Sequence, residues 1–354
     1  MMTKNILFCI NSLTIGGAEQ LLVDKINNWP NNDNIHLVLF LDQVDLLPKI
    51  IRHITLVKII SQSNLYKIKR LRNYLKIHKI DYCFSHLEKP NKVSLFAALF
   101  SKTKTIPVVH NVDLYKNNLF KEKITFVIYH LMASKIVAIS DAVFNYLTND
   151  LNLNPKNVNL IENGLDFNRI KFDNSFKDFG QYKNFFCLGR LVEAKGYDFM
   201  LDCLKDENII NKDWKLTMIG DGDQKKKLDI LITKYNLNEK VIMIGKKMNP
   251  FSFIKSGSIA LMPSKREGLP IALLEILSQG IPILSSDIYP LEIISNNYNG
   301  LKFKSTSKKD FKRSFLEALE IDKDHYKTLS TNATSSVQNH CITSCVKSYT
   351  KLIS

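Results

Sequence analysis

Short apolar segments alternate with longer amphipathic segments along the whole chain. The short segments are rich in Ile, Leu, Val and Phe, which is typical of strands buried on both faces of a parallel sheet. We expect strands at Asn5–Ile10, Ile35–Phe40, Tyr82–Ser85, Thr105–His110, Lys135–Ile139, Phe185–Leu188, Lys215–Ile219, Val241–Ile244, Ser258–Met262 and Ile281–Ser285. Apolar residues at helical spacing predict helices between them, such as Ala18–Asn28, Asp198–Lys205, Gln224–Tyr235 and Ile271–Ser278. This alternation predicts α/β sheets with helices on both faces.

The alternation runs twice, and 354 residues are long for a single hydrophobic core. The stretch Asn163–Phe179 is rich in Asn, Asp, Lys and Phe and has no clear period, so we interpret it as a hinge. We expect doubly wound, Rossmann-like domains over residues 1–165 and 166–335, and a C-terminal helix over 336–354 that packs back on the first domain. Ligands of such sheets bind beyond the carboxyl ends of the strands, so two facing domains predict a ligand cleft between them.

The charge of the chain is strongly basic and evenly spread. There are 49 Lys and Arg against 34 Asp and Glu, a net charge of +15, with 20 against 12 in residues 1–165 and 29 against 22 in the rest. An even excess argues against a basic tail and suits anionic partners, such as nucleotides, phosphorylated lipids, a membrane surface or nucleic acid. Charge alone does not choose among them.

The six cysteines are scattered, and no two have the Cys-x-x-Cys spacing of a zinc knuckle or a redox centre. They are Cys9, Cys83, Cys187, Cys203, Cys341 and Cys345. We interpret them as reduced thiols. The first apolar run ends at Asn11, which is too early for a signal peptide, and no run approaches the ~20 residues of a spanning helix. We therefore expect a cytoplasmic protein, at most peripheral at the inner face of the plasma membrane.

A first candidate site is Gly16-Gly17-Ala18-Glu19, which follows the first expected strand and opens a helix. Paired glycines allow backbone N–H groups to approach a phosphate or a sugar, and the helix N-terminus attracts negative charge. The spacing is not Gly-x-Gly-x-x-Gly, so the dinucleotide fingerprint is absent. A plain tight turn explains the glycines equally well.

A second candidate is the segment Gly189-Arg190-Leu191-Val192-Glu193-Ala194-Lys195-Gly196, which also follows a buried strand. Arg190 and Lys195 are two cations in a loop bounded by glycines, and together they can bind two phosphate groups of one ligand. The alternative is an ordinary solvated loop.

The third and most specific candidate runs from Pro263 to Glu275 and joins a strand to a helix that begins near Pro270 or Ile271. Proline suits the first helical turn because it has no N–H to lose. The free N–H groups around Gly268 to Ala272 then form an anion site at the positive end of the helix.

Two glutamates belong to this third segment. Glu267 lies at the mouth of the anion site, and Glu275 lies among apolar residues of the helix. A carboxylate in apolar surroundings is costly unless hydroxyl or amide groups satisfy it, and a ribose diol would do so. The alternative is a capping role for Glu267 and a helix-surface position for Glu275.

These segments resemble, in order along most of the chain, the motifs of the large retaining glycosyltransferase group with the GT-B fold (glycosyltransferases group 1, family 4-like). Glu267 and Glu275 resemble its Glu-x7-Glu signature, and Gly189–Gly196 its Gly-Arg-Leu-x-x-x-Lys-Gly loop. The further matches are Asn163-Gly164-Leu165-Asp166 with its hinge, Gly220-Asp221-Gly222 with its Gly-x-Gly turn, and Gly16-Gly17-Ala18-Glu19 with its N-terminal glycine motif.

The resemblance implies roles for the matching positions. Arg190 and Lys195 would bind the donor diphosphate, Glu275 the ribose, and Glu267 the hydroxyls of the donor sugar. The remaining donor-binding candidates are Gly16, Gly17, Asn163, Gly189, Gly268, Leu269, Pro270 and Ile271. His110 resembles a histidine near the reacting sugar, and Ser140 a contact to phosphate or acceptor. Pro270 stands where many members have glycine, which removes one N–H donor.

A basic segment over Asn64–Lys79 has an apolar stripe formed by Leu65, Ile68, Leu71 and Leu75. It predicts either an interfacial helix on anionic lipid or an ordinary helix with its stripe in the core. Asp221-Gly222-Asp223 resembles an Asp-x-Asp metal site, but its place between a strand and a helix favours a turn and an N-cap, so we expect no metal there.

We therefore predict a retaining hexosyltransferase that needs no cofactor and uses a UDP- or GDP-sugar as donor. The acceptor would be a hydroxyl of a growing surface glycan, a free or lipid-linked precursor of a polysaccharide or lipopolysaccharide. One alternative is a nucleotide-sugar epimerase of similar fold. Another is a basic nucleic-acid-binding protein, against which the even charge and the absence of a recognised motif argue, so nucleic acid is not an expected partner.

Overall fold

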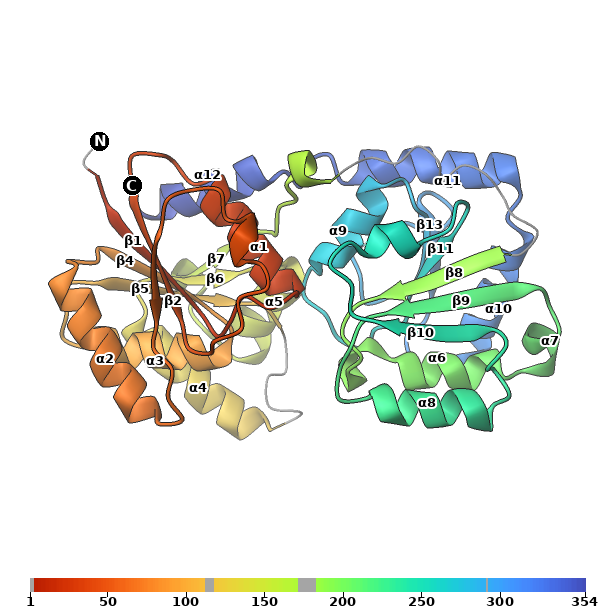
Figure 1. Cartoon of the computed structure of the whole chain (residues 1–354), viewed down its shortest axis with the longest axis horizontal. Coiled ribbons are helices and arrows are strands. Elements are labelled where there is room, and N and C mark those ends of the chain that lie inside the picture. Colours follow the sequence, from red (N-terminus) through yellow and green to blue (C-terminus); the bar gives the residue numbers. More distant parts are fainter. Residues whose placement is uncertain (1–2, 112–117, 171–182, 291) are drawn as a thin grey trace. The chain divides into compact units, whose positions relative to one another are not determined.

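The computed structural model describes residues 3–111, 118–170, 183–290 and 292–354. It divides into an N-terminal unit, made of Met1–Asp166 with His340–Ser354, and a C-terminal unit, Phe167–Asn339 (Figure 1). Residues 171–182, which include the second half of the expected hinge Asn163–Phe179, lie outside the described part of the chain.

The N-terminal unit is built on a parallel sheet. Its described strands, in sheet order, are β3 (Thr55–Lys58), β2 (Asn34–Leu39), β1 (Asn5–Ile10), β4 (Tyr82–His86), β5 (Lys104–Val109), β6 (Ile136–Ala138) and β7 (Val158–Leu160). The described helices are α1 (Gly17–Asn27), α2 (Asn64–Ile77), α3 (Glu88–Ala98), α4 (Leu119–Met132), α5 (Asp141–Asn145) and α12 (Ile342–Leu352). The strand order reverses between β1 and β4, which is the position where ligands bind in doubly wound sheets.

The last helix, α12, returns to the N-terminal unit and packs close to Gly164. A Cβ atom on Gly164 would lie 2.7 Å from the Cα atom of Ile342, so only glycine fits there. Leu165 N–H donates to the carbonyl of His340 at 2.7 Å, and Lys25 Nζ donates to the hydroxyl of Tyr349 at 2.7 Å. The end of the chain is therefore an integral part of the first unit.

The C-terminal unit has a second parallel sheet. Its described strands, in sheet order, are β10 (Val241–Gly245), β9 (Trp214–Ile219), β8 (Lys183–Leu188), β11 (Ile259–Met262), β12 (Ile283–Ser286) and β13 (Gly300–Phe303). The described helices are α6 (Tyr197–Leu204), α7 (Glu207–Ile210), α8 (Lys225–Lys234), α9 (Ile271–Ser278), α10 (Lys308–Glu320) and α11 (Lys323–Ser336). The order reverses between β8 and β11.

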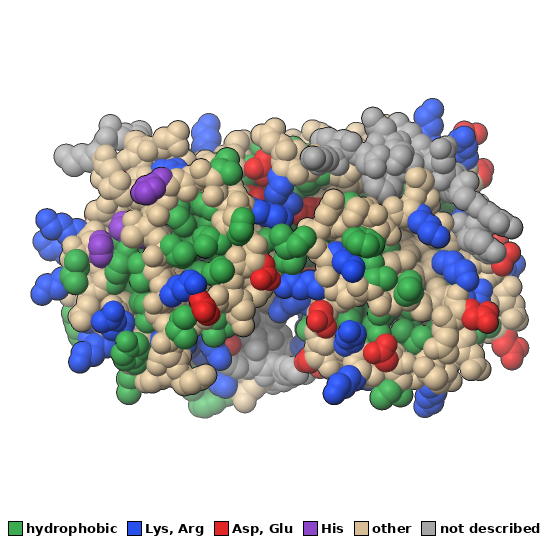
Figure 2. Space-filling view, viewed as in Figure 1, with side chains coloured by type: hydrophobic (Ala, Val, Ile, Leu, Met, Phe, Trp, Pro, Cys, Tyr) green, Lys and Arg blue, Asp and Glu red, His purple; other side chains and the backbone are tan. Residues whose placement is uncertain are grey.

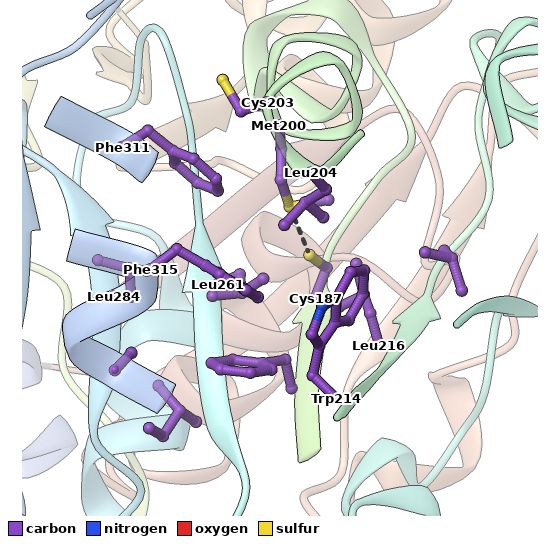
Figure 3. Close-up of a cluster of buried hydrophobic side chains, with 14 of the residues drawn as sticks. Cys187, Met200, Cys203, Leu204, Trp214, Leu216, Leu261, Leu284, Phe311 and Phe315 are labelled. Carbon is purple, nitrogen blue, oxygen red and sulfur yellow. Dashed lines mark hydrogen bonds between the residues drawn. The ribbon is translucent and has the colours of Figure 1, made fainter. Parts of the chain in front are cut away.

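The core on one side of this second sheet fixes β8 against α6 and α10 (Figure 3). Cys187 on β8 lies 3.7 Å from the sulfur of Met200 on α6, and Trp214 makes an edge contact with Phe315 on α10. All of these side chains are buried. Because side chains in a protein core are close-packed, these contacts fix the position of β8 relative to the start of α6. The loop that joins them is therefore held at both ends.

The α/β fold with two doubly wound sheets is confirmed, and each of the ten strands predicted from the sequence is present. The strands that the sequence did not predict, β3, β7 and β13, lie at the edges of their sheets. Edge strands are short and only partly apolar, which weakens their pattern in the sequence. Lys302, for example, interrupts the apolar run of β13.

The basic helix α2 packs the middle of its apolar stripe into the core. Leu71 and Leu75 are buried, and Ile68 packs against the same cluster, whereas Leu65 is exposed. Of the two readings of this segment, the ordinary domain helix therefore explains most of the stripe. Among the described helices, none combines the length and the apolar character needed to cross a bilayer.

Candidate active site

The loop after β8 carries Arg190 and Lys195 and is pinned by its neighbours. Leu191 N–H donates to the carbonyl of Asp221 at 2.9 Å. Lys195 ends a short 3₁₀ turn, Glu193–Lys195, and Arg190 is exposed. The backbone of the loop is therefore fixed by the loop after β9, while the two cations differ in their contact with solvent.

Glycines allow three loops at this edge of the sheet to touch. A Cβ atom on Gly196 would lie 2.1 Å from the carbonyl oxygen of Pro263, and Gly196 also has a φ of +68°. A Cβ atom on Gly220 would lie 1.8 Å from the carbonyl oxygen of Gly189. Larger residues cannot occupy these positions without moving a backbone, so the loops after β8, β9 and β11 form one unit.

This close packing brings Lys195 to Glu267. Lys195 Nζ lies 2.5 Å from Glu267 Oε1, and the two side chains are only 13% and 12% exposed. Ser264 Oγ donates to the same carboxylate oxygen at 3.2 Å, and Ser286 Oγ donates to the Ser264 carbonyl at 2.7 Å. A largely buried ion pair with supporting hydrogen bonds holds both charged groups in place.

The pair lies where the strand order of the second sheet reverses. Lys195 follows β8 and Glu267 follows β11, and these two strands are neighbours in the sheet. In open α/β sheets, ligands bind at this position because the loops diverge to either side. The second and third candidate segments thus meet where the strand order reverses, which we call the switch point of the sheet.

The helix of the third segment, α9, begins at Ile271, as predicted. Pro270 is its N-cap residue and has an extended backbone, and no side chain caps the helix there. Gly268, Leu269 and Ile271 are buried. The first-turn N–H groups therefore lie beside Glu267 at the positive end of the helix, where a negatively charged or hydroxyl-bearing group is favoured.

Glu275, inside this helix, forms an ion pair that the sequence analysis did not predict. Arg169 Nη2 donates to Glu275 Oε1 at 2.8 Å, and the glutamate is 14% exposed. Arg169 ends the short 3₁₀ turn Phe167–Arg169 at the start of the second unit. A cation next to the carboxylate removes part of the cost of burying it and fixes its orientation.

Two tyrosines near the Lys195–Glu267 pair were also missed. Tyr197 and Tyr289 are buried, and burial together with the negative charge of Glu267 raises the pKa of both phenols. Both are therefore neutral at physiological pH. Tyr289 follows β12, at the same edge of the sheet, and that position was the available signal in the sequence.

In the N-terminal unit, His110 follows β5 directly and pairs with His86 at the end of β4. The two ring nitrogens, His86 Nδ1 and His110 Nε2, are 3.0 Å apart. Burial, with the nearby charge of Lys25, lowers the pKa of His110 to about 3 and lowers the pKa of His86 as well. A neutral, hydrogen-bonded His110 can orient a polar group but cannot act as a general base with a pKa near 7.

This histidine pair predicts a loss of stability in acid. The unfolded histidines bind a proton near pH 6.5, whereas the folded ones stay neutral until well below it, so unfolding takes up protons between these values. The free energy of unfolding should be undiminished above about pH 6.5 and should fall as the pH drops, by up to about 1.4 kcal/mol per pH unit for each histidine. Thermal unfolding followed by circular dichroism between neutral and mildly acidic pH measures this slope. The double variant His86→Asn, His110→Asn should flatten it, and an unchanged slope would contradict the assignment.

The other predicted residues of the N-terminal unit take structural positions. Gly16 is the N-cap of α1 and Gly17 its first residue, and a Cβ atom on Gly16 would lie 2.3 Å from Glu19 Oε2. Ser140 caps α5 by accepting the N–H of Val143 at 3.3 Å. Asn163 is buried beside Gly164. Binding by these residues stays a prediction.

The segment after β9 forms the turn that we expected, but not the expected cap. Asp221 Oδ1 accepts the N–H of Gly222 at 2.8 Å, and the N-cap of α8 is Gln224, with no side-chain hydrogen bond. The prediction that Asp221-Gly222-Asp223 contains the N-cap was therefore wrong, since the N-cap is the next residue, Gln224. Among the described residues, no group of three or more His, Cys, Asp or Glu side chains could hold a metal ion.

Each half of the chain matches a known protein family. The model of the family described as Glycosyltransferase Family 4 matches residues 15–169, and the model of Glycosyl transferases group 1 matches residues 168–336. The two matches are consecutive and follow the two sheets. The chain is a glycosyltransferase with the GT-B fold. The Lys195–Glu267 pair lies at the switch point of the second sheet of this glycosyltransferase.

Named relatives of this glycosyltransferase act in glycan biosynthesis. It is 26% identical to the amylovoran biosynthesis glycosyltransferase AmsD of Erwinia amylovora, over 82% of this chain and 84% of that protein. It is 25% identical to an N-acetylgalactosaminyltransferase of Campylobacter jejuni, over 78% of this chain and 79% of the relative, whose name gives a diphospho-undecaprenol-linked acceptor. The crystal structure of Anabaena HepE in complex with UDP-glucose matches with a TM-score of 0.84 at 18% identity, over 99% of both chains.

Proposed function

We propose that this glycosyltransferase transfers a hexosyl unit, with retention, from a UDP- or GDP-sugar to a hydroxyl of a growing glycan. The observation that carries the proposal is the largely buried Lys195–Glu267 pair at the switch point between β8 and β11. It holds one cation suited to a diphosphate and one carboxylate suited to sugar hydroxyls at the tip of helix α9. The complex of HepE with UDP-glucose supports a nucleotide sugar as donor.

In the proposed reaction, the bond between the anomeric carbon and the diphosphate oxygen breaks as the acceptor oxygen bonds to the same carbon. The hydroxyl proton passes to an oxygen of the departing diphosphate, so a nucleoside diphosphate and a glycoside are formed. Lys195 and Arg190 stabilise the negative charge that develops on the leaving group, together with the first-turn N–H groups of α9. Glu267 orients the sugar, and Glu275, fixed by Arg169, accepts the ribose hydroxyls.

We propose further that the acceptor is a lipid-linked precursor of a surface glycan and that the protein works at the cytoplasmic face of the membrane. The diphospho-undecaprenol-linked acceptor in the name of the Campylobacter relative supports this choice. The roles that the resemblance implies for His110 and Ser140, on the acceptor side, belong to the same proposal.

A panel of donors tests the reaction. The unfolding midpoint is measured with UDP-, GDP- and ADP-sugars, and we expect a UDP- or GDP-sugar at about 100 times its Kd to stabilise the protein by about 2.7 kcal/mol. For a unit of the size of either half of this chain, that stabilisation raises the unfolding midpoint by about 5 °C or more. No shift with any nucleotide sugar would contradict the proposal. Release of an isomerised donor without acceptor would favour the epimerase instead.

A further inference from the structure

Helix α4 of the N-terminal unit is apolar on two opposite faces. Its inner face is in the core, where Phe126 and Tyr129 are fully buried and the Tyr129 hydroxyl donates to the carbonyl of Glu88 at 3.4 Å. Its outer face consists of Phe120, Ile124, Val127 and Leu131, which are 76%, 48%, 50% and 76% exposed. An apolar helix face normally packs against other side chains, so the exposed outer face of α4 is unusual.

The outer face of α4 is one continuous stripe. Positions 120, 124, 127 and 131 are separated by four, three and four residues, so their side chains lie in one row along the helix. Single exposed apolar residues are normal on protein surfaces, but a contiguous row of large ones marks a surface that binds something apolar.

A second exposed apolar group lies just after the end of α3. Phe100 is 97% exposed and has a φ of +62°, a conformation that is unfavourable for a bulky residue. Arg72 of α2 holds this end in place, since its guanidinium donates to the carbonyl of Phe96 at 2.7 Å and to that of Ala97 at 3.2 Å. The phenyl ring therefore projects into solvent from a fixed backbone, not from a loose end.

The charged side chains of α4 and of the helices α3 and α2 are almost all positive. Helix α3 packs against both α2 and α4, so the three form one layer of the unit (Figure 1). The lysines and arginines of these helices are Lys67, Lys69, Arg70, Arg72, Lys76, Lys89, Lys92, Lys121 and Lys123. Of their two glutamates, Glu122 is fully buried and Glu88 pairs with Lys92 at 2.7 Å. Figure 2 shows basic and apolar side chains side by side where α2 lies, without acidic ones among them.

We infer that the outer face of α4 binds an anionic lipid surface. An apolar row suits the acyl region just below the headgroups, and the basic side chains of α2, α3 and α4 suit anionic headgroups, whereas a protein partner would need acidic groups to pair with them. The apolar stripe of α2, the other candidate for an interfacial helix, is mostly in the core. The inference concerns binding only and stands whether or not the proposed sugar transfer is correct.

Flotation of the full-length protein with lipid vesicles tests this inference. We expect binding to vesicles of phosphatidylcholine with phosphatidylglycerol, and weak binding to phosphatidylcholine alone. The double variant Phe120→Ser, Leu131→Ser should lower the affinity for the anionic vesicles about tenfold or more, because the two most exposed apolar groups are lost. High salt should weaken binding of the unchanged protein by screening.

Ile230→Ser is the matched control, because Ile230 is a 66% exposed apolar residue on helix α8 of the other unit. This variant should bind as the unchanged protein does, and all variants should keep the same unfolding midpoint. Three results would overturn the inference: no binding to either vesicle, equal binding to both, or a dimer in solution that the double variant dissociates. The measurement needs neither donor nor acceptor, so its outcome is separate from that of the donor panel.

Discussion

Replacing Lys195 by alanine is expected to lower kcat/KM for sugar transfer about a hundredfold to a thousandfold while the protein stays folded. Removal of one preorganised group that stabilises transition-state charge has an effect of that size in other enzymes. Lys195 is suited to this role because the loop after β8 is pinned on both sides and its ammonium is largely buried. Initial rates at varied donor concentration, with one acceptor, measure the change.

Lys312→Ala is the matched control for this experiment. Lys312 is in the same unit and also pairs with a carboxylate, that of Asp206 at 2.5 Å, but it lies on α10, outside the candidate segments, and is 35% exposed. Its loss should leave kcat/KM within a factor of a few. Lys195→Ala also leaves Glu267 unpaired, so Lys195→Ala with Glu267→Gln separates the two effects: the double variant should regain stability and not activity. Near-normal turnover of Lys195→Ala would refute the diphosphate role.

Replacing Glu275 by glutamine is expected to weaken binding of the nucleotide about tenfold to a hundredfold. Hydrogen bonds to a charged group contribute about 1.5–3 kcal/mol, and the neutral amide offers the ribose diol a weaker acceptor. Isothermal titration with the nucleoside diphosphate identified in the donor panel measures the change. An affinity equal to that of the unchanged protein would contradict the ribose assignment.

Inorganic pyrophosphate is the control ligand that separates binding of the ribose from binding of the diphosphate. It has no ribose, so Glu275→Gln should bind it as the unchanged protein does, whereas Lys195→Ala should bind it more weakly.

Arg169→Met tests the positioning role of Arg169, which donates to Glu275 Oε1. We expect a loss of nucleotide affinity in the same direction as for Glu275→Gln, again without effect on pyrophosphate. Tighter nucleotide binding in Arg169→Met would mean that the arginine competes with the ribose.

Much of the fold was predictable because buried parallel strands leave a strong local pattern. The run Asn5–Ile10 is apolar almost throughout and is β1 as predicted, and helix α9 spans the predicted Ile271–Ser278. Prediction failed where burial is one-sided or slight, as at β3, whose ends are exposed at the edge of the sheet. Helix α4 was not recognised, although Phe120, Ile124, Val127 and Leu131 follow one another at helical spacing in the sequence.

The candidate site was predictable in part for a related reason. Arg190, Lys195 and Glu267 follow strands, and in a parallel sheet the carboxyl ends of strands share one edge. The sequence also placed Pro270 at the start of a helix. It contained no sign of Arg169, because an isolated arginine in an irregular segment carries no periodicity and matches no expected motif.

Local sequence is enough to specify which segments become strands and helices and which charged residues follow the strands, since periodicity and glycine placement act over a few residues. Which charges meet depends on tertiary packing. Lys195 reaches Glu267 because β8 lies next to β11, and Arg169 reaches Glu275 across 106 positions of the chain. Strand order and helix packing arise from the joint burial of many distant side chains, and no local pattern encodes them.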